Sequence, residues 1–419
     1  MNRFFKLAAV SAVVATLAAC SGGSDFDPES ALTGSHLYTQ TNETRNQIIH
    51  YARKKDGTLV EVERVGSGGM GTNGAKPLTG AKSEPDSLVS AGAVAMNADH
   101  SLLFGVNAGD ASVSIFAIGN DGKLELRDRQ PTGEKGAPSS VTFNNRTQTL
   151  YVLHTQGPNH IRSFKVVDGK LVSTGNAYTV NTAQFGDRVA SQIISSPDDR
   201  FVLVDVLFNA PPRVENGAAV LTPSNAGTKD GVMVFPVNED GSLGNVVIND
   251  AGGPTPFSLA FLHGSTNTFV NTLAAGNGVV LSTLGADGRI SSSPVANVDL
   301  SAAPNGPSET CWVSLSADNR YAYATNFGFG NITSFAIDNG TIRTVANNQG
   351  HVAGDGTYRG AAGVVTSGPV DSWASSDGHL YQVYPNAKEL VAYKMNGATL
   401  EKLASYPVPY NSPMGLVGY

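Results

Sequence analysis

Cysteine is almost absent from this chain, which has Cys20 and Cys311 as its only two. Cys20 ends an N-terminal segment that is expected to be processed, so the folded part keeps Cys311 alone. An intrachain disulfide in the mature domain is therefore excluded. Cys311 falls on a predicted inner strand, where a buried and inert thiol is expected, with a reactive nucleophile as the alternative.

Charged side chains are also scarce. They make up 15% of the sequence, below the usual quarter, and the formal net charge is −7. No basic stripe is left that could follow a phosphate backbone, so nucleic acid is not an expected partner. Glycine is abundant, with 47 residues, as expected for a chain with many tight turns.

Local catalytic and cofactor motifs are missing as well. No G-x-S-x-G elbow, H-E-x-x-H, P-loop or EF-hand pattern occurs, and the eight histidines are scattered. GSGGMG, at residues 66–71, fits G-x-G-x-x-G, but no helix follows it, so it is interpreted as loop composition. Neither a cofactor nor a metal ion is expected.

One apolar run stands out, from Leu7 to Ala19, and it is too short to span a bilayer. Arg3 and Lys6 precede it, which is typical of a secretory signal. The run ends in Leu-Ala-Ala-Cys and resembles the lipobox of bacterial lipoproteins, which implies lipidation of Cys20. Ser21 then implies sorting to an outer membrane, facing the periplasm or the cell surface. A plain export signal is the alternative.

The organising element of the remaining chain is the stretch from Glu309 to Ile342. Alternating apolar and polar residues form short runs there, separated by turn formers such as Ala317-Asp318-Asn319 and Asp338-Asn339-Gly340. This pattern predicts four antiparallel strands in one small sheet. Such a sheet cannot bury its faces alone, so similar sheets must pack against it.

Five further complete copies of this unit follow the same order of turns. A seventh copy, His36 to Val65, lacks its first strand, and Pro413 to Tyr419 at the other end of the chain supplies a candidate for it. The sequence therefore predicts an all-β, seven-bladed propeller over residues 36–419, with about 55 residues per blade. Residues 1–20 are the expected signal, and 21–35, rich in Gly, Ser and acidic residues, are an expected flexible tether.

Three long insertions all fall on one face of the predicted disc, whereas the other face has only tight turns. They are Val65 to Ser87, Asn209 to Lys229 and Asn348 to Gly368. Loops presented by a rigid scaffold often carry function, so this loop-rich face is the expected binding face. Length variation without function is the alternative.

Candidate site residues lie where first strands begin or second strands end on that face. Asp205, inside FVLVDVLF, is the most telling of them, because a buried carboxylate needs a partner or a function. A structural bond to a neighbouring blade is the alternative for it. The predicted catalytic carboxylates are Asp205, Glu309 and Asp371, and the predicted ligand-binding residues are Arg188, Gln192, Ser258, His154 and Asn326.

The repeats SPDDRFVLVDV, SADNRYAYATN, NEDGSL and NDGKLEL resemble those of the seven-bladed lactonase family. That family includes 6-phosphogluconolactonases and 3-carboxymuconate lactonising enzymes, and the resemblance covers His36 to Tyr419. The family's site motifs are altered here. Thr255 and Ser258 stand where the family has a basic pair, and Gln192 aligns with a family histidine. Trp312 aligns with a family glutamate, and in this chain Glu309 lies three positions before Trp312. Asp205 and Asp230 represent the family's D-L-G-x-D, with an insertion between them.

Two functions of different class follow from these observations. The first is a lactonase-like hydrolase, in which a carboxylate or histidine activates water while a cationic or amide donor steadies the oxyanion. The second is a non-enzymatic propeller of the cell envelope that binds a ligand or a protein partner. A small molecule or lactone is the expected ligand, the lipid anchor is the expected membrane contact, and the expected state is a monomer.

Overall fold

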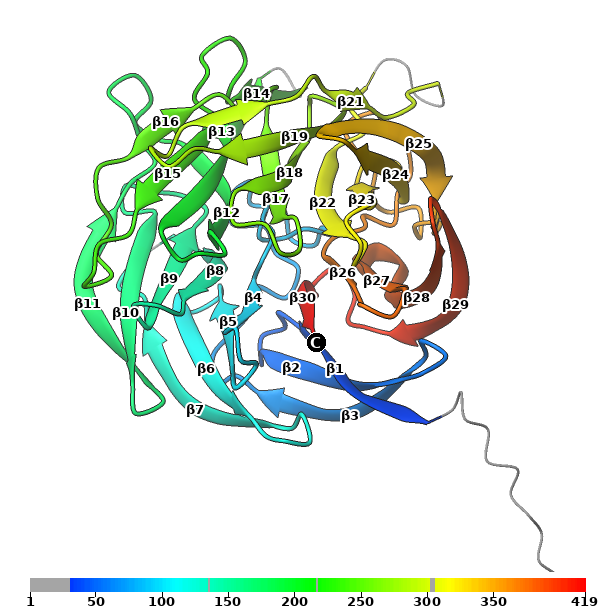
Figure 1. The fold of residues 1–419 in the computed structure, drawn as a ribbon, viewed down its shortest axis with the longest axis horizontal. Coiled ribbons are helices and arrows are strands. Elements are labelled where there is room, and N and C mark those ends of the chain that lie inside the picture. Colours follow the sequence, from blue (N-terminus) through cyan, green and yellow to red (C-terminus); the bar gives the residue numbers. More distant parts are fainter. Residues whose placement is uncertain (1–30, 135, 216–217, 302–305) are drawn as a thin grey trace, which may run out of the picture.

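The computed structural model describes residues 31–134, 136–215, 218–301 and 306–419. Its strands form seven antiparallel sheets, which Figure 1 shows arranged as blades around a central axis. The predicted seven-bladed propeller is therefore confirmed. The predicted signal segment and its Cys20 lie outside the described residues.

Apart from the C-terminal strand, which joins blade one, the strands of blades one to three follow one another along the chain. The strands of each blade are given from the innermost to the outermost. Blade one contains β30 (Met414–Gly418), β1 (Leu32–Gln40), β2 (Gln47–Lys54) and β3 (Leu59–Gly66). Blade two contains β4 (Val94–Met96), β5 (Leu102–Asn107), β6 (Ser112–Ile118) and β7 (Leu124–Pro131). Blade three contains β8 (Pro138–Asn144), β9 (Thr149–His154), β10 (Ile161–Val167) and β11 (Lys170–Tyr178).

Blades four and five each carry an additional strand. Blade four contains β12 (Val189–Ser195), β13 (Phe201–Glu215), β15 (Val232–Pro236) and β16 (Val247–Asn249), with β14 (Ala218–Pro223) paired to β13. Blade five contains β17 (Pro256–Phe261), β18 (Thr268–Leu273), β19 (Gly278–Leu284) and β20 (Ile290–Ser292), with β21 (Ala296–Asn297) paired to β19.

Blades six and seven complete the ring. Blade six contains β22 (Thr310–Leu315), β23 (Tyr321–Asn326), β24 (Asn331–Asp338) and β25 (Thr341–Gln349). Blade seven contains β26 (Ser372–Ala374), β27 (His379–Tyr384), β28 (Glu389–Asn396) and β29 (Thr399–Pro407), with the 3₁₀ turn η2 (Pro385–Ala387) between β27 and β28. Within the described ranges no helix is long and apolar enough to cross a membrane.

The tight turns between the first and second strands of blades four, six and seven share one design, which blade six illustrates. Ser316 donates its hydroxyl to Asp318 Oδ1 at 2.7 Å, and Asp318 also accepts from the Arg320 amide at 3.0 Å. Asn319 takes the left-handed conformation that closes the turn, with φ of 58°. Ser196 and Asp198 repeat the same bond in blade four at 2.6 Å. Local side-chain chemistry therefore sets the register of the hairpin.

The ring closes through its two ends. Leu37 of β1 pairs with Gly418 of β30, and His36 and Tyr419 exchange two backbone hydrogen bonds of 3.0 Å. This confirms the predicted completion of blade one by the C-terminal strand. β1 begins at Leu32, however, so the sheet starts within the range that was expected to be tether.

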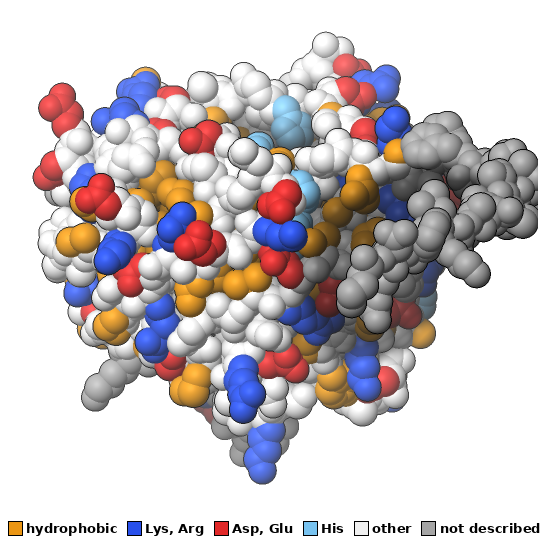
Figure 2. All heavy atoms as spheres, turned by 90° about the horizontal axis from the view of Figure 1, so that it is seen from below, with side chains coloured by type: hydrophobic (Ala, Val, Ile, Leu, Met, Phe, Trp, Pro, Cys, Tyr) orange, Lys and Arg blue, Asp and Glu red, His pale blue; other side chains and the backbone are white. Residues whose placement is uncertain are grey.

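Apolar side chains fill the space between neighbouring blades. Tyr151, Tyr323, Phe104 and Phe116 are among the largest side chains that are fully buried there. On the surface that Figure 2 shows, acidic and basic side chains are interspersed, with apolar side chains between them.

Candidate functional site

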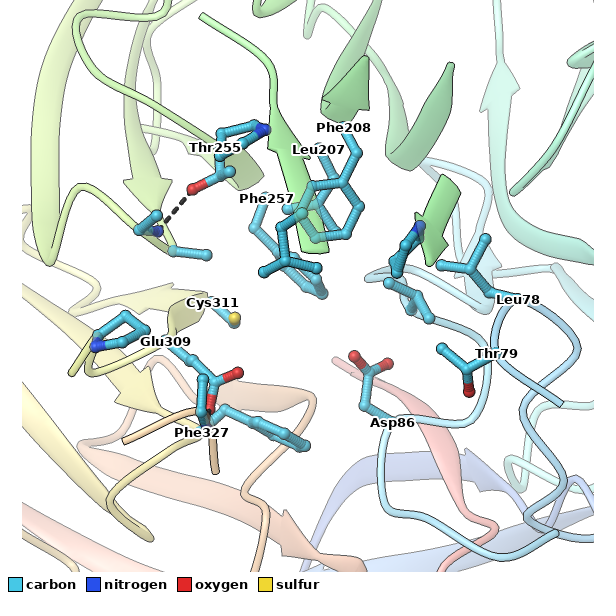
Figure 3. A pocket seen from close by; sticks show the side chains of 18 of the residues that line it. Leu78, Thr79, Asp86, Leu207, Phe208, Thr255, Phe257, Glu309, Cys311 and Phe327 are labelled. Atoms are coloured by element: carbon cyan, nitrogen blue, oxygen red, sulfur yellow. Dashed lines mark hydrogen bonds between the residues drawn. The ribbon is translucent and has the colours of Figure 1, made fainter. Parts of the chain in front are cut away.

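A cavity of about 230 Å³ lies on the loop-rich face, and each of the three insertions contributes to its wall. The strand ends of blades four, five and six form its floor (Figure 3). The insertion residues in the wall are Lys76, Leu78, Thr79 and Asp86 from the first, Pro212, Leu221 and Pro223 from the second, and Tyr358 and Ala361 from the third.

Glu309 is the predicted site residue that lines this cavity. It directly precedes β22, and its Oε2 accepts a hydrogen bond of 3.1 Å from the Ala361 amide in the third insertion. Burial raises the pKa of Glu309, although the Ala361 amide and the charge of Lys76 act in the opposite direction. Its carboxyl group thus lies at the junction of blade six and the third insertion.

Asp86, at the end of the first insertion, is a second carboxyl group in the wall that sequence reasoning did not single out. It is 5% exposed, and its Oδ1 accepts from the Ser90 amide at 3.1 Å. Burial raises the pKa of Asp86 well above its usual range, which favours the protonated form. Figure 3 shows Asp86 and Glu309 on either side of the cavity, with their carboxyl groups directed into it.

Backbone strain gathers around the same space. Asp86, Val89, Thr255 and Glu309 all line the cavity, and their φ angles are 53°, 55°, 54° and 54°. A left-handed conformation is a true outlier for the β-branched Val89 and Thr255, and it costs about 1–3 kcal/mol per residue. Such strain clusters at functional sites, because the surrounding structure must hold it in place.

Cys311 also faces this cavity from β22 (Figure 3). It is 5% exposed, as expected for a buried thiol, and burial raises its pKa well above the usual range. A thiol that resists ionisation is a poor nucleophile. Cys311 therefore contributes shape and apolar surface rather than an attacking group.

Lys76 is the one basic residue in the described part of the cavity wall. Its Nζ lies 3.3 Å from Glu84 Oε2, so its charge is already paired. Apart from Asp86 and Glu309, the wall is mainly apolar and aromatic. Phe257, Phe327, Tyr358, Leu207 and Phe208 form much of it.

Asp205 lies outside this cavity, contrary to its predicted place at the channel mouth. It is fully buried on β13, where its Oδ1 accepts from Asn271 Nδ2 of blade five at 3.0 Å. Burial raises the pKa of Asp205 to about 7. Its environment is that of a structural contact between two blades, which was the alternative for this residue.

Asp371 also lies away from the loop-rich cavity. Its carboxylate accepts from the Gly415 amide at 2.8 Å and from the Gly92 amide at 3.3 Å, and thereby joins the inner strands of blades seven, one and two. Burial raises the pKa of Asp371 to about 6. Gln192 and Ser258 line the same inner cavity of about 340 Å³ as Asp371.

The predicted ligand-binding residues are occupied by bonds within the fold. Gln192 accepts from the Leu259 amide at 2.6 Å, and Ser258 donates to the Cys311 carbonyl at 2.7 Å. Arg188 is fully buried and binds Asn209 and Asp230. The remaining two are also bonded internally, His154 to Thr132 and His160, and Asn326 to Asn331 and Thr333.

No cluster of three or more His, Cys, Asp or Glu side chains suited to a metal ion occurs within the described ranges. The two carboxyl groups that face one cavity are those of Asp86 and Glu309.

Residues 24–185 match the family model described as "Lactonase, 7-bladed beta-propeller". This match spans β1 to β11, which are blades two and three and all of blade one except β30, and it confirms the resemblance there. No curated protein matches the chain at a significant level.

Solved structures extend the likeness to the whole ring. A periplasmic gluconolactonase of Pseudomonas aeruginosa is 17% identical, covers 92% of this chain and 98% of its own, and has a TM-score of 0.65. Putative 6-phosphogluconolactonases of Bacteroides fragilis and Bacteroides uniformis are 17% and 16% identical, with TM-scores of 0.64 and 0.66. They cover 92% of this chain and 98% and 99% of their own. At these identities the likeness shows the fold.

Proposed function

We propose that this chain, a lactonase-type propeller, hydrolyses a lactone in the cavity between Asp86 and Glu309. The observation that carries the proposal is a pair of carboxyl groups, the buried Asp86 and the half-buried Glu309, that face one cavity (Figure 3). The match to the lactonase family model over residues 24–185 supports the same reaction class.

The two carboxyl groups suit different roles. Burial raises the pKa of both carboxyl groups, and it raises that of Asp86 well above its usual range, while the charge of Lys76 acts in the opposite direction on both. Two carboxyl groups whose environments separate their pKa values are typical of an acid and base pair. Glu309 is therefore the proposed base, and Asp86 the proposed donor.

The reaction then runs as a simple hydrolysis. Glu309 takes a proton from water, and the water oxygen adds to the lactone carbonyl carbon. Protonated Asp86 donates a hydrogen bond to the oxygen that becomes negative. The ring C–O bond breaks, the proton on Glu309 passes to the leaving oxygen, and an open hydroxy acid leaves.

A lactone panel tests the proposal on wild-type protein and on single amide variants. Glu309→Gln should reduce turnover by about 10²-fold or more, because the base is lost. Asp86→Asn keeps a donor and should cost about tenfold. Asp205→Asn is the matched control, since it removes a buried carboxyl group outside the cavity, and its turnover should stay near wild type.

Two results would count against this function. Turnover in Glu309→Gln equal to wild type would remove Glu309 from the reaction. Absence of turnover with every lactone, together with retention of a lactone by the purified protein, would favour the non-enzymatic binding propeller instead.

We also propose an envelope location with a lipid on Cys20, supported by the Leu-Ala-Ala-Cys segment. Cys20→Ser should release the protein into the soluble periplasmic fraction, because one acylated terminus is its only expected anchor. Fractionation and immunoblotting measure this. A Cys20→Ser protein that stays with the membrane would show that another contact holds it there.

A further inference from the structure

We propose that the cavity accepts an uncharged lactone with a small apolar substituent and disfavours phosphorylated or carboxylated lactones. This inference names the substrate class of the proposed function and rests on it. Its evidence is separate, because it comes from the charge and surface of the cavity wall rather than from the carboxyl pair as acid and base.

The charges of the wall oppose a bound anion. Phosphate and carboxylate groups are usually held by arginine forks or by several free donors. Lys76 is the one basic residue in the described part of the wall, and Glu84 already pairs with it at 3.3 Å. Asp86 and Glu309 add carboxyl groups, so a second anion in this space would face repulsion from Glu309.

Two other donors are also used within the fold, Arg188, which is fully buried outside the cavity lining, and Thr255, which lines the cavity. Arg188 gives its Nε to Asn209 Oδ1 at 2.9 Å and its Nη2 to the Asp230 carbonyl at 2.7 Å. Thr255 donates its hydroxyl to the Pro254 carbonyl at 2.7 Å and accepts from the Ala275 amide at 2.5 Å. Neither group is free to receive a phosphate oxygen.

The remaining surface of the wall is apolar and well supported. Phe257 stacks edge-on against Trp312 with centroids 4.6 Å apart, and Phe327 meets Tyr358 in the same way at 5.5 Å. These contacts hold the aromatic rings in place. Each methylene group of a ligand that such a wall removes from water makes the binding free energy more favourable by about 0.8 kcal/mol.

The size of the cavity limits the substituent. Its volume of about 230 Å³ is below the roughly 300–1,000 Å³ that is typical of drug-sized ligands. A lactone ring with a short chain fits this space better than a large glycoside. Leu221, which is 45% exposed, lines the rim and extends the apolar surface toward solvent.

The test compares hydrolysis of γ-lactones with alkyl chains of increasing length, matched lactones that end in a carboxylate, and a sugar δ-lactone with and without phosphate. We expect kcat/KM to rise about tenfold for every two methylene groups until the cavity is full. The charged member of each pair should be at least tenfold poorer. A phosphorylated or carboxylated lactone that is preferred tenfold would overturn the inference while leaving lactone hydrolysis intact.

A variant that adds a cation makes the test independent of the substrate series. Leu78→Arg should shift the kcat/KM ratio by more than tenfold in favour of the carboxylate-bearing lactone. Val172→Arg adds the same charge on β11, where Val172 is 51% exposed and far from the cavity wall, and should leave the ratio unchanged. Equal ratios in both variants would also overturn the inference.

Binding of the corresponding alkyl γ-lactams, measured by calorimetry, separates the two proposals. Lactams keep the shape but resist hydrolysis. Alkyl lactams that bind while no lactone is hydrolysed would support the ligand class and overturn the proposed function. Alkyl lactams that bind no better than the unsubstituted ring would overturn the ligand class, whatever the turnover.

Discussion

Asp205 and Asp86 are both buried aspartates, yet their surroundings differ in kind. Asp205 has Asn271 as its hydrogen-bond partner, and its Oδ2 has no partner within the described residues. Asp86 faces a cavity that a ligand or water can enter. A carboxyl group sealed between two blades acts on stability, whereas one that faces a cavity is available to act on a ligand.

The stability of an Asp205→Asn variant should depend on pH differently from that of wild type. The unfolded carboxyl loses its proton near pH 3.8, but the folded one keeps it until about pH 7. The folded state therefore binds more protons between these values, and wild-type stability falls as pH rises through that window. The variant lacks this loss, so its stability relative to wild type should rise, by on the order of 4 kcal/mol from pH 4 to pH 8.

Urea unfolding at several pH values measures this difference. Asp371→Asn is a matched comparison, because its window has the same sign but ends at about pH 6. A difference that stays flat across the series would mean that folding does not raise the pKa of Asp205.

At the residue scale, the sequence predicted one of the two carboxyl groups in the cavity wall. Glu309 was found because strand order places it at the loop-rich end of blade six. Strand position gives the end of a blade but not the neighbour that a side chain meets, so it did not show that Asp205 and Asp371 lie outside this cavity. Asp86 was missed, because the first insertion has no periodic pattern that shows how it folds back over the disc.

The β13–β14 hairpin is the element that departs most from the sequence prediction. Residues 209–229 were expected to be a loop, but β13 continues to Glu215 and pairs with β14. Pro211 and Pro212 interrupt the strand pattern, since proline removes a ladder donor, and this concealed the extension. The blades themselves were predicted well, because alternation and turn residues recur in each of them.

Replacing residues 210–222 by a short turn should leave the propeller folded. β13 pairs with β12 and β15 only through Phe208 and the residues before it, so the ladder of blade four is retained. The wall loses Pro212 and Leu221, and affinity for an alkyl lactam should fall about fivefold, on the order of 1 kcal/mol.

Thermal unfolding and lactam calorimetry on the shortened protein check both statements. Shortening the tight turn at Asn339 and Gly340, on the opposite face, is the control for loop engineering as such. If the shortened protein does not fold, residues 210–222 are needed for the stability of blade four, and this prediction is wrong.

For the whole molecule, closure depends on the last strand. Deleting residues 413–419 removes Met414 and Leu416, which are 1% and 5% exposed, and leaves β1 with an open edge. Two buried apolar side chains contribute about 1.5–3 kcal/mol each, and an open edge favours aggregation. We expect a large fall in melting temperature or insoluble protein.

Calorimetry and light scattering measure the outcome. Deleting seven residues from the expected tether, 21–27, is the control of equal length. A protein without residues 413–419 that melts like the full chain would show that the ring does not need this strand.

The backbone pairing of His36 with Tyr419 also places both residues at one rim of the disc. β1 and β30 are antiparallel, so the start of β1 and the end of β30 lie at the same rim of the disc, the one with the tight turns. The three insertions and their cavity occupy the opposite rim. An anchor on Cys20 would thus turn the tight-turn rim toward the bilayer and the cavity toward open water, so that substrate would arrive by diffusion from solution and the headgroups would not obstruct it.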